Sequence, residues 1–119
     1  MTADRREELV REIYDGFNAG DLERAAEVLA DEVVWPDALD GGQVQGRESV
    51  VENWRGILSL VKSSRIEPTA MAGVGDPTTF DVRVHQTIER ADGIETMQLV
   101  HRFHFAGEEI TELEILDLG

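Results

Sequence analysis

The chain has 119 residues, of which 41% are hydrophobic and 30% charged, and its formal net charge is −14 at pH 7. This length predicts a single domain over residues 1–119, and the composition excludes a disordered or membrane-spanning chain. Because so negative a protein repels phosphate groups, neither nucleic acid nor an anionic membrane is an expected partner. The absence of cysteine and a charged N-terminal segment without an apolar core favour a cytoplasmic location.

The N-terminal third of the chain predicts two helices joined by a tight turn. Residues 7–17 predict the first helix, because one stripe of it carries Leu9, Val10, Ile13, Tyr14 and Phe17. Gly20 can adopt the left-handed conformation that ends a helix, and Asp21 can cap the N–H groups of the next one. The second helix is predicted from the helical spacing of Leu22, Ala25, Ala26 and Leu29.

A short buried strand and a third helix follow. Val33-Val34-Trp35 predicts the strand, which Pro36 ends, so that Asp37 lies directly after it. The three glycines of residues 38–46 predict a mobile loop that rims or covers a pocket. Residues 47–61 predict the third helix, since apolar residues including Trp54 recur there at spacings of three and four.

From Ser64 onward the pattern alternates and predicts a sheet with strands at 65–74, 80–91, 94–105 and 110–116. Pro68 predicts that the first of these is an edge or irregular strand. Asp92-Gly93 predicts a two-residue type I′ turn, which sets Val84 opposite His101 and leaves one face apolar and the other polar. For the last strand two inner-face sets compete: Thr111, Leu113, Ile115 and Asp117, or Ile110, Glu112, Glu114 and Leu116.

The stretch FNAGDLERAAEVLADEVVWPD, residues 17–37, resembles the start of the nuclear transport factor 2 (NTF2) fold, which includes the SnoaL-like polyketide cyclases and the ketosteroid isomerases. In that family, NAGD between two helices and a hydrophobic-x-Asp pattern after the first strand recur. The resemblance implies an α+β fold in which three N-terminal helices pack on a curved, mixed, mostly antiparallel sheet to form a cone. It also favours the first of the two inner-face sets and a homodimer.

The cone would enclose a pocket for a small hydrophobic ligand. The residues expected to line it and to bind the ligand are Tyr14, Phe17, Trp35, Trp54, Phe80, Val82, Val84, Gln86, Leu99, Phe103 and Leu113. His101 lies among them, and Asp37 follows the first strand. If Asp37 faces an apolar pocket, its pKa is expected to be raised, which would make it a usable general base.

Comparison with the ketosteroid isomerases places the catalytic base on Asp37 and the oxyanion-binding aspartic acid on His101. The family's tyrosine falls on Ile13, and Tyr14 lies about 100° further round the helix, so whether Tyr14 replaces the missing hydroxyl stays open. The resemblance therefore implies a proton transfer next to a carbonyl group, with Asp37 as base and His101 as donor.

No metal or other cofactor is expected, because His101 and His104 are three residues apart on a strand and point to opposite faces. Two functions remain open. One is a cofactor-free isomerase or cyclase acting on a small hydrophobic carbonyl compound, and the other is a non-catalytic ligand-binding or dimerisation module. In a dimer, Arg83 and Arg102 on the polar face could pair across a two-fold axis with Glu112 and Glu114.

Overall fold

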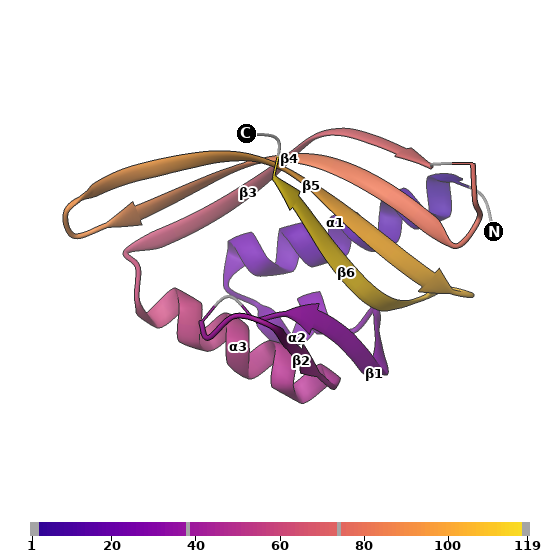
Figure 1. Ribbon diagram of the computed structural model, residues 1–119, viewed down its shortest axis with the longest axis horizontal. Helices are drawn as coiled ribbons and strands as arrows, with labels where there is room; N and C mark the ends of the chain where they lie inside the picture. Colours follow the sequence, from indigo (N-terminus) through magenta and orange to yellow (C-terminus); the bar gives the residue numbers. More distant parts are fainter. Residues whose placement is uncertain (1–2, 38, 74, 118–119) are drawn as a thin grey trace.

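The computed structural model describes residues 3–37, 39–73 and 75–117, and within these ranges three helices lie against one face of a curved, six-stranded sheet (Figure 1). The helices are α1 (Ala3–Ala19), α2 (Leu22–Ala26) and α3 (Arg47–Ser59). The strands are β1 (Leu29–Pro36), β2 (Gln43–Gln45), β3 (Ser63–Gly73), β4 (Thr79–Arg90), β5 (Gly93–Ala106) and β6 (Glu109–Asp117).

The strand order across the sheet is β2-β1-β6-β5-β4-β3. Only the β1–β6 pair among the described strands is parallel, and the other neighbours are antiparallel. The predicted α+β architecture with a mixed, mostly antiparallel sheet is therefore confirmed. No helix in the described parts of the chain is both long and apolar enough to cross a membrane.

The turn between α1 and α2 forms as predicted. Gly20 has φ +77°, and Asp21 caps α2 by accepting a hydrogen bond from the Arg24 backbone N–H at 3.2 Å. The helix is shorter than its apolar spacing indicated, however, because Leu29 already belongs to β1, where it pairs with Ile110 of β6. Both side chains are fully buried, so burial in the sheet overrides the helical periodicity.

Residues 43–45 are not loop, and the prediction of a loop throughout 38–46 was wrong for them. They form β2, a short edge strand in which Val44 pairs with Trp35 of β1. Two backbone hydrogen bonds hold the chain where it turns back from β1 to β2. Asp37 N donates to Gly42 O at 2.9 Å, and Gly41 N donates to Asp37 O at 3.0 Å. A strand of three residues is too short to show alternation in the sequence.

The β4–β5 hairpin is shifted by two residues from the predicted register. Arg90 pairs with Gly93, and His101 lies opposite Val82 instead of Val84. A type I′ turn needs a positive φ at Asp92, and none of the described non-glycine residues has one. The two turn residues are thus Ala91 and Asp92. A shift of two keeps every side chain on its predicted face.

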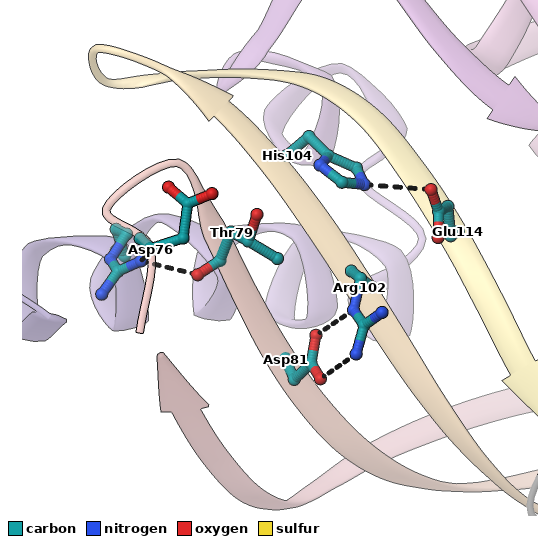
Figure 2. A network of polar contacts seen from close by, with 7 residues as sticks. Asp76, Thr79, Asp81, Arg102, His104 and Glu114 are labelled. Carbon is teal, nitrogen blue, oxygen red and sulfur yellow. Dashed lines mark hydrogen bonds and ion pairs between the residues drawn. The ribbon is translucent and has the colours of Figure 1, made fainter. Parts of the chain in front are cut away.

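Charge pairing on the outer face agrees with the observed register (Figure 2). Arg102 donates two hydrogen bonds to the Asp81 carboxylate, at 2.8 and 2.9 Å, and His104 contacts Glu114 at 3.2 Å. The predicted register would have placed Arg83 beside Arg102, and like charges directly opposite each other are destabilising. The predicted arginine pair is therefore wrong, and a bidentate ion pair takes its place.

Two strands of the sheet, β3 and β6, contain bulges. Pro68 lies in β3, an edge strand whose register shifts between Pro68 and Ala70, which confirms the prediction drawn from that proline. In β6 the register shifts at Thr111, because His104 pairs with Glu112 while Phe105 pairs with Ile110. Ile110 and Leu113 are consequently both buried. Before the bulge, the inner face belongs to the set that contains Ile110. After the bulge, it belongs to the set that contains Leu113.

Candidate functional site

A cavity of about 270 Å³ lies between α1, α3 and the inner face of the sheet. Its walls come from the second half of α1, the end of β1, the middle of α3 and the inner faces of β3 to β6. The residues that line it are Ile13, Tyr14, Phe17, Trp35, Pro36, Asn53, Trp54, Ile57, Ile66, Gln86, Ile88, Arg90, Met97, His101, Phe103, Leu113 and Ile115.

The predicted binding residues divide into two groups. Those that line the cavity are Tyr14, Phe17, Trp35, Trp54, Gln86, Phe103 and Leu113, together with His101. The structure places Phe80, Val82, Val84 and Leu99 in the solid core instead, with at most 8% of each exposed. The cavity therefore lies toward the β4–β5 turn, while the other end of β4 is covered by α1, whose Arg6 guanidinium lies 5.0 Å from the Phe80 ring centre.

Tyr14 and His101 form the polar centre of the cavity. The Tyr14 hydroxyl lies 2.9 Å from His101 Nδ1, and the two rings are stacked with their centres 5.8 Å apart. Tyr14 comes from α1 and His101 from the middle of β5, so packing of the helix on the sheet creates the pair. The Tyr14 hydroxyl thus reaches His101, although the family's tyrosine aligns one residue earlier.

Burial keeps both members of this pair neutral. It lowers the pKa of His101 to about 4 and raises the pKa of Tyr14 well above its ordinary value of 10. The neutral pair carries two polar hydrogens, one on the phenol and one on the imidazole. Their mutual hydrogen bond uses one of them in either tautomer, so the other remains available for a ligand.

The second ring nitrogen of His101 makes no hydrogen bond within the described chain. Nδ1 makes the hydrogen bond to Tyr14, and within the described residues no hydrogen bond is made by Nε2. Arg6 Nε is the one buried side-chain nitrogen or oxygen of the described chain that lacks a partner. His101 Nε2 is therefore not among the fully enclosed unpaired atoms, and the His101 side chain lines the cavity.

Asp37 lies beside the cavity and does not line it. Its Oδ1 accepts hydrogen bonds from the backbone N–H groups of Leu39 and Asp40, at 2.9 and 3.0 Å, and from the Asn53 side chain at 2.8 Å. These donors hold the pKa of Asp37 below its ordinary value, with the Asp40 N–H contributing most. The expectation of a raised pKa was wrong, because the carboxylate faces a tight turn and no apolar wall.

Two polar residues of the cavity, Asn53 and Arg90, were not among those predicted from the sequence. Asn53 lies on the apolar face of α3, three residues after Val50, and it connects Asp37 to the cavity. Arg90 continues the inner-face alternation of β4 beyond Gln86 and Ile88. Both could have been found from the sequence by including polar residues in the inward-facing sets, at helical spacing in α3 and at every second position in β4.

Cofactor ligands are scarce around this cavity. Within the described ranges no three side chains of the types His, Cys, Asp and Glu cluster so that they could hold a metal ion. His101 points inward, whereas His104 lies on the outer face with Glu114. What the cavity offers is a hydrogen-bond donor at Tyr14–His101 within aromatic and aliphatic walls.

The sequence profile of the SnoaL-like domain family matches residues 10–113 of the chain. The chain belongs to the SnoaL-like domain family. A sequence search among curated proteins finds no significant match. The resemblance seen in residues 17–37 is thereby confirmed, and for this SnoaL-like protein the match extends from α1 to β6.

Solved structures share the fold of this SnoaL-like protein. TerC, co-crystallised with polyporic acid, has a TM-score of 0.84 and 18% identity over 95% of this chain and 91% of its own. An NTF2-like protein of unknown function from Burkholderia pseudomallei K96243 has a TM-score of 0.84 and 23% identity, over 98% and 92%. The epoxide hydrolase/cyclase-like enzyme SalBIII of salinomycin pyran ring formation has a TM-score of 0.81 and 17% identity, over 96% and 91%. At these identities the likeness is one of fold.

Proposed function

We propose that this SnoaL-like protein binds a small hydrophobic carbonyl compound in its cavity and isomerises or cyclises it without a cofactor. The observation that carries the proposal is the Tyr14–His101 pair, which lies in an apolar cavity and keeps one hydrogen free to donate. A carbonyl oxygen placed there would accept that hydrogen bond. The similar folds of a cyclase-like enzyme and of a protein co-crystallised with polyporic acid support this class of ligand.

The pair would act by stabilising negative charge on the bound oxygen. Removing a proton next to a carbonyl group produces an enolate, whose charge resides largely on that oxygen. A preoriented donor in a cavity of low polarity stabilises such a charge more strongly than water does. The base then returns the proton to a different carbon of the conjugated enolate, which isomerises the compound. Alternatively, the enolate carbon attacks a second carbonyl carbon of the same molecule and the resulting alkoxide takes up the proton, which closes a ring.

Asp37 is the proton acceptor in this proposal. It follows Pro36 and binds Asn53, and both of these residues line the cavity. Its three hydrogen-bond donors lower its pKa and make it a weak base. A weak base removes only a rather acidic proton, which favours compounds whose reacting carbon lies between two carbonyl groups.

The competing function is ligand binding without catalysis. The position of Asp37 favours it, because this carboxylate is held in a turn beside the cavity and does not project into it. Both functions require the same cavity and the same Tyr14–His101 donor. They differ in whether a proton leaves the bound compound.

Deuterium exchange into a 1,3-diketone separates the two functions. We expect the protein in D₂O to speed exchange at the central carbon of benzoylacetone, followed by NMR at a mildly acidic pH. Asp37→Asn should slow the catalysed exchange by about tenfold or more without weakening binding. Asp40→Asn is the matched control, because Asp40 contributes its backbone N–H to the same turn. Binding without faster exchange would leave the non-catalytic function in place.

We also propose that two copies associate through the outer face of the sheet. Arg102 is already tied to Asp81 within the chain, whereas the exposed Arg83 lies on the same face and is the better probe. We expect light scattering to show a dimer that Arg83→Glu weakens at moderate salt. A wild-type monomer at micromolar concentration would contradict the dimer, and a dimer insensitive to Arg83→Glu would place the interface elsewhere.

A further inference from the structure

The residues that line the cavity extend along the β4–β5 hairpin. On β4 its wall continues from Gln86 through Ile88 to Arg90, and on β5 it runs from Met97 to His101. His101 pairs with Val82, eight residues before Arg90 on β4, so His101 and Arg90 lie at opposite ends of this wall. In Figure 1 the β4–β5 hairpin extends well beyond the body of the sheet, and Arg90, which lines the cavity, lies near its turn. The cavity volume of about 270 Å³ leaves room for a small molecule between these two ends.

The two ends of the cavity differ in polarity and exposure. At the inner end, Tyr14 and His101 are buried and uncharged. At the outer end, the Arg90 side chain is 43% exposed. Arg90 is the one charged side chain among the residues that line the cavity. The cavity thus carries a neutral donor at its base and a cation at its mouth.

Arg90 retains the capacity to bind an anion. Its Nη2 lies 3.3 Å from Glu95 Oε1, a single contact between half-exposed groups. Exposed ion pairs of this kind contribute little, and a guanidinium has five N–H donors, which suit a carboxylate held by two hydrogen bonds. A ligand carboxylate at the mouth would therefore compete with Glu95 for Arg90.

We infer that the cavity accepts a linear oxo acid, with its carbonyl oxygen at Tyr14–His101 and its carboxylate at Arg90. The inference rests on the proposed function for the inner end and adds the anionic group and the extended shape. The methylene chain of such a molecule matches the apolar walls between the two polar ends. In a protein with a net charge of −14, a cation at the mouth also offsets the repulsion that an anionic ligand meets.

Calorimetric titration with 11-oxododecanoate and with its neutral analogue 11-oxododecanamide tests the inference. We expect the wild-type protein to bind the carboxylate more tightly than the amide, and added salt to reduce the difference. Arg90→Gln should weaken carboxylate binding by about fivefold and leave amide binding unchanged. Glu95→Gln should strengthen carboxylate binding by about twofold, because it removes the competing anion.

Arg65→Gln is the matched control, because Arg65 lies on the neighbouring strand β3, is ion-paired with Glu67 at 3.1 Å and does not line the cavity. It should change neither affinity. Equal binding of carboxylate and amide, or equal losses of both in Arg90→Gln, would overturn the inference and leave the proposed function standing. Failure of the wild-type protein to bind either compound would overturn the linear ligand, while benzoylacetone exchange would still test the proposed function.

Discussion

On acidification, the free energy of unfolding of the wild-type protein is expected to fall by about 3 kcal/mol more than that of His101→Gln. Burial lowers the pKa of His101 from 6.5 to about 4 in the folded protein. Between these two pH values the unfolded chain is therefore protonated at His101 while the folded protein is not. The stability that neutral His101 provides is complete above pH 6.5. It is lost progressively as the pH falls from 6.5 to about 4.

Urea unfolding of the wild-type protein and of His101→Gln at a series of pH values would measure this contribution. The carboxylates titrate in both proteins, so the difference between the two curves isolates His101. His85→Gln serves as the control, since His85 lies on the outer face with Gln98. Parallel curves for wild type and His101→Gln would contradict the buried, neutral histidine on which the proposed oxygen-binding site depends.

Periodicity in the sequence predicted which residues share a face but could not determine how the strands pair. The inner and outer faces of β4 and β5 are correct, yet the register is shifted by two, because Asp92 does not adopt the positive φ that the predicted turn needs. Alternation is unchanged by a shift of two. The register agrees instead with a contact between distant residues, the ion pair of Arg102 with Asp81.

The sequence predicted many of the residues that line the cavity, but not how Tyr14 and Asp37 are placed around it. His101 could be recognised as a polar residue within an apolar alternation, and it lines the cavity. The role of Tyr14 depends on how α1 is rotated against β5, which spacing within one helix cannot show. Asp37 was correctly placed after β1, but the direction of its pKa shift depends on the Leu39 and Asp40 N–H groups that its own turn brings to it.

The joint that orients Tyr14 also depends on a glycine whose importance the sequence did not reveal. Gly16 lies in α1, two residues after Tyr14, where α2 packs against the helix. A Cβ atom there would lie 2.7 Å from the Ala25 backbone nitrogen and 2.9 Å from both Ala25 Cβ and the Asp21 carbonyl oxygen. Two of these atoms belong to the backbone, and Asp21 N also donates to Gly16 O at 2.8 Å. The two helices therefore cannot accommodate a methyl group without separating.

Gly16→Ala is expected to lower the free energy of unfolding by about 2 kcal/mol or more, although alanine in a helix is ordinarily favoured over glycine by about 1 kcal/mol. Gly56→Ala in α3 is the matched comparison. Its Cβ would meet Leu39 Cδ1 at 2.6 Å, but the Leu39 side chain is 42% exposed and can turn away. Gly56→Ala should thus be neutral or stabilising by up to about 1 kcal/mol. Urea unfolding followed by circular dichroism would measure both, and equal effects of the two substitutions would show that helix propensity, and not the close approach of α2, determines the result at Gly16.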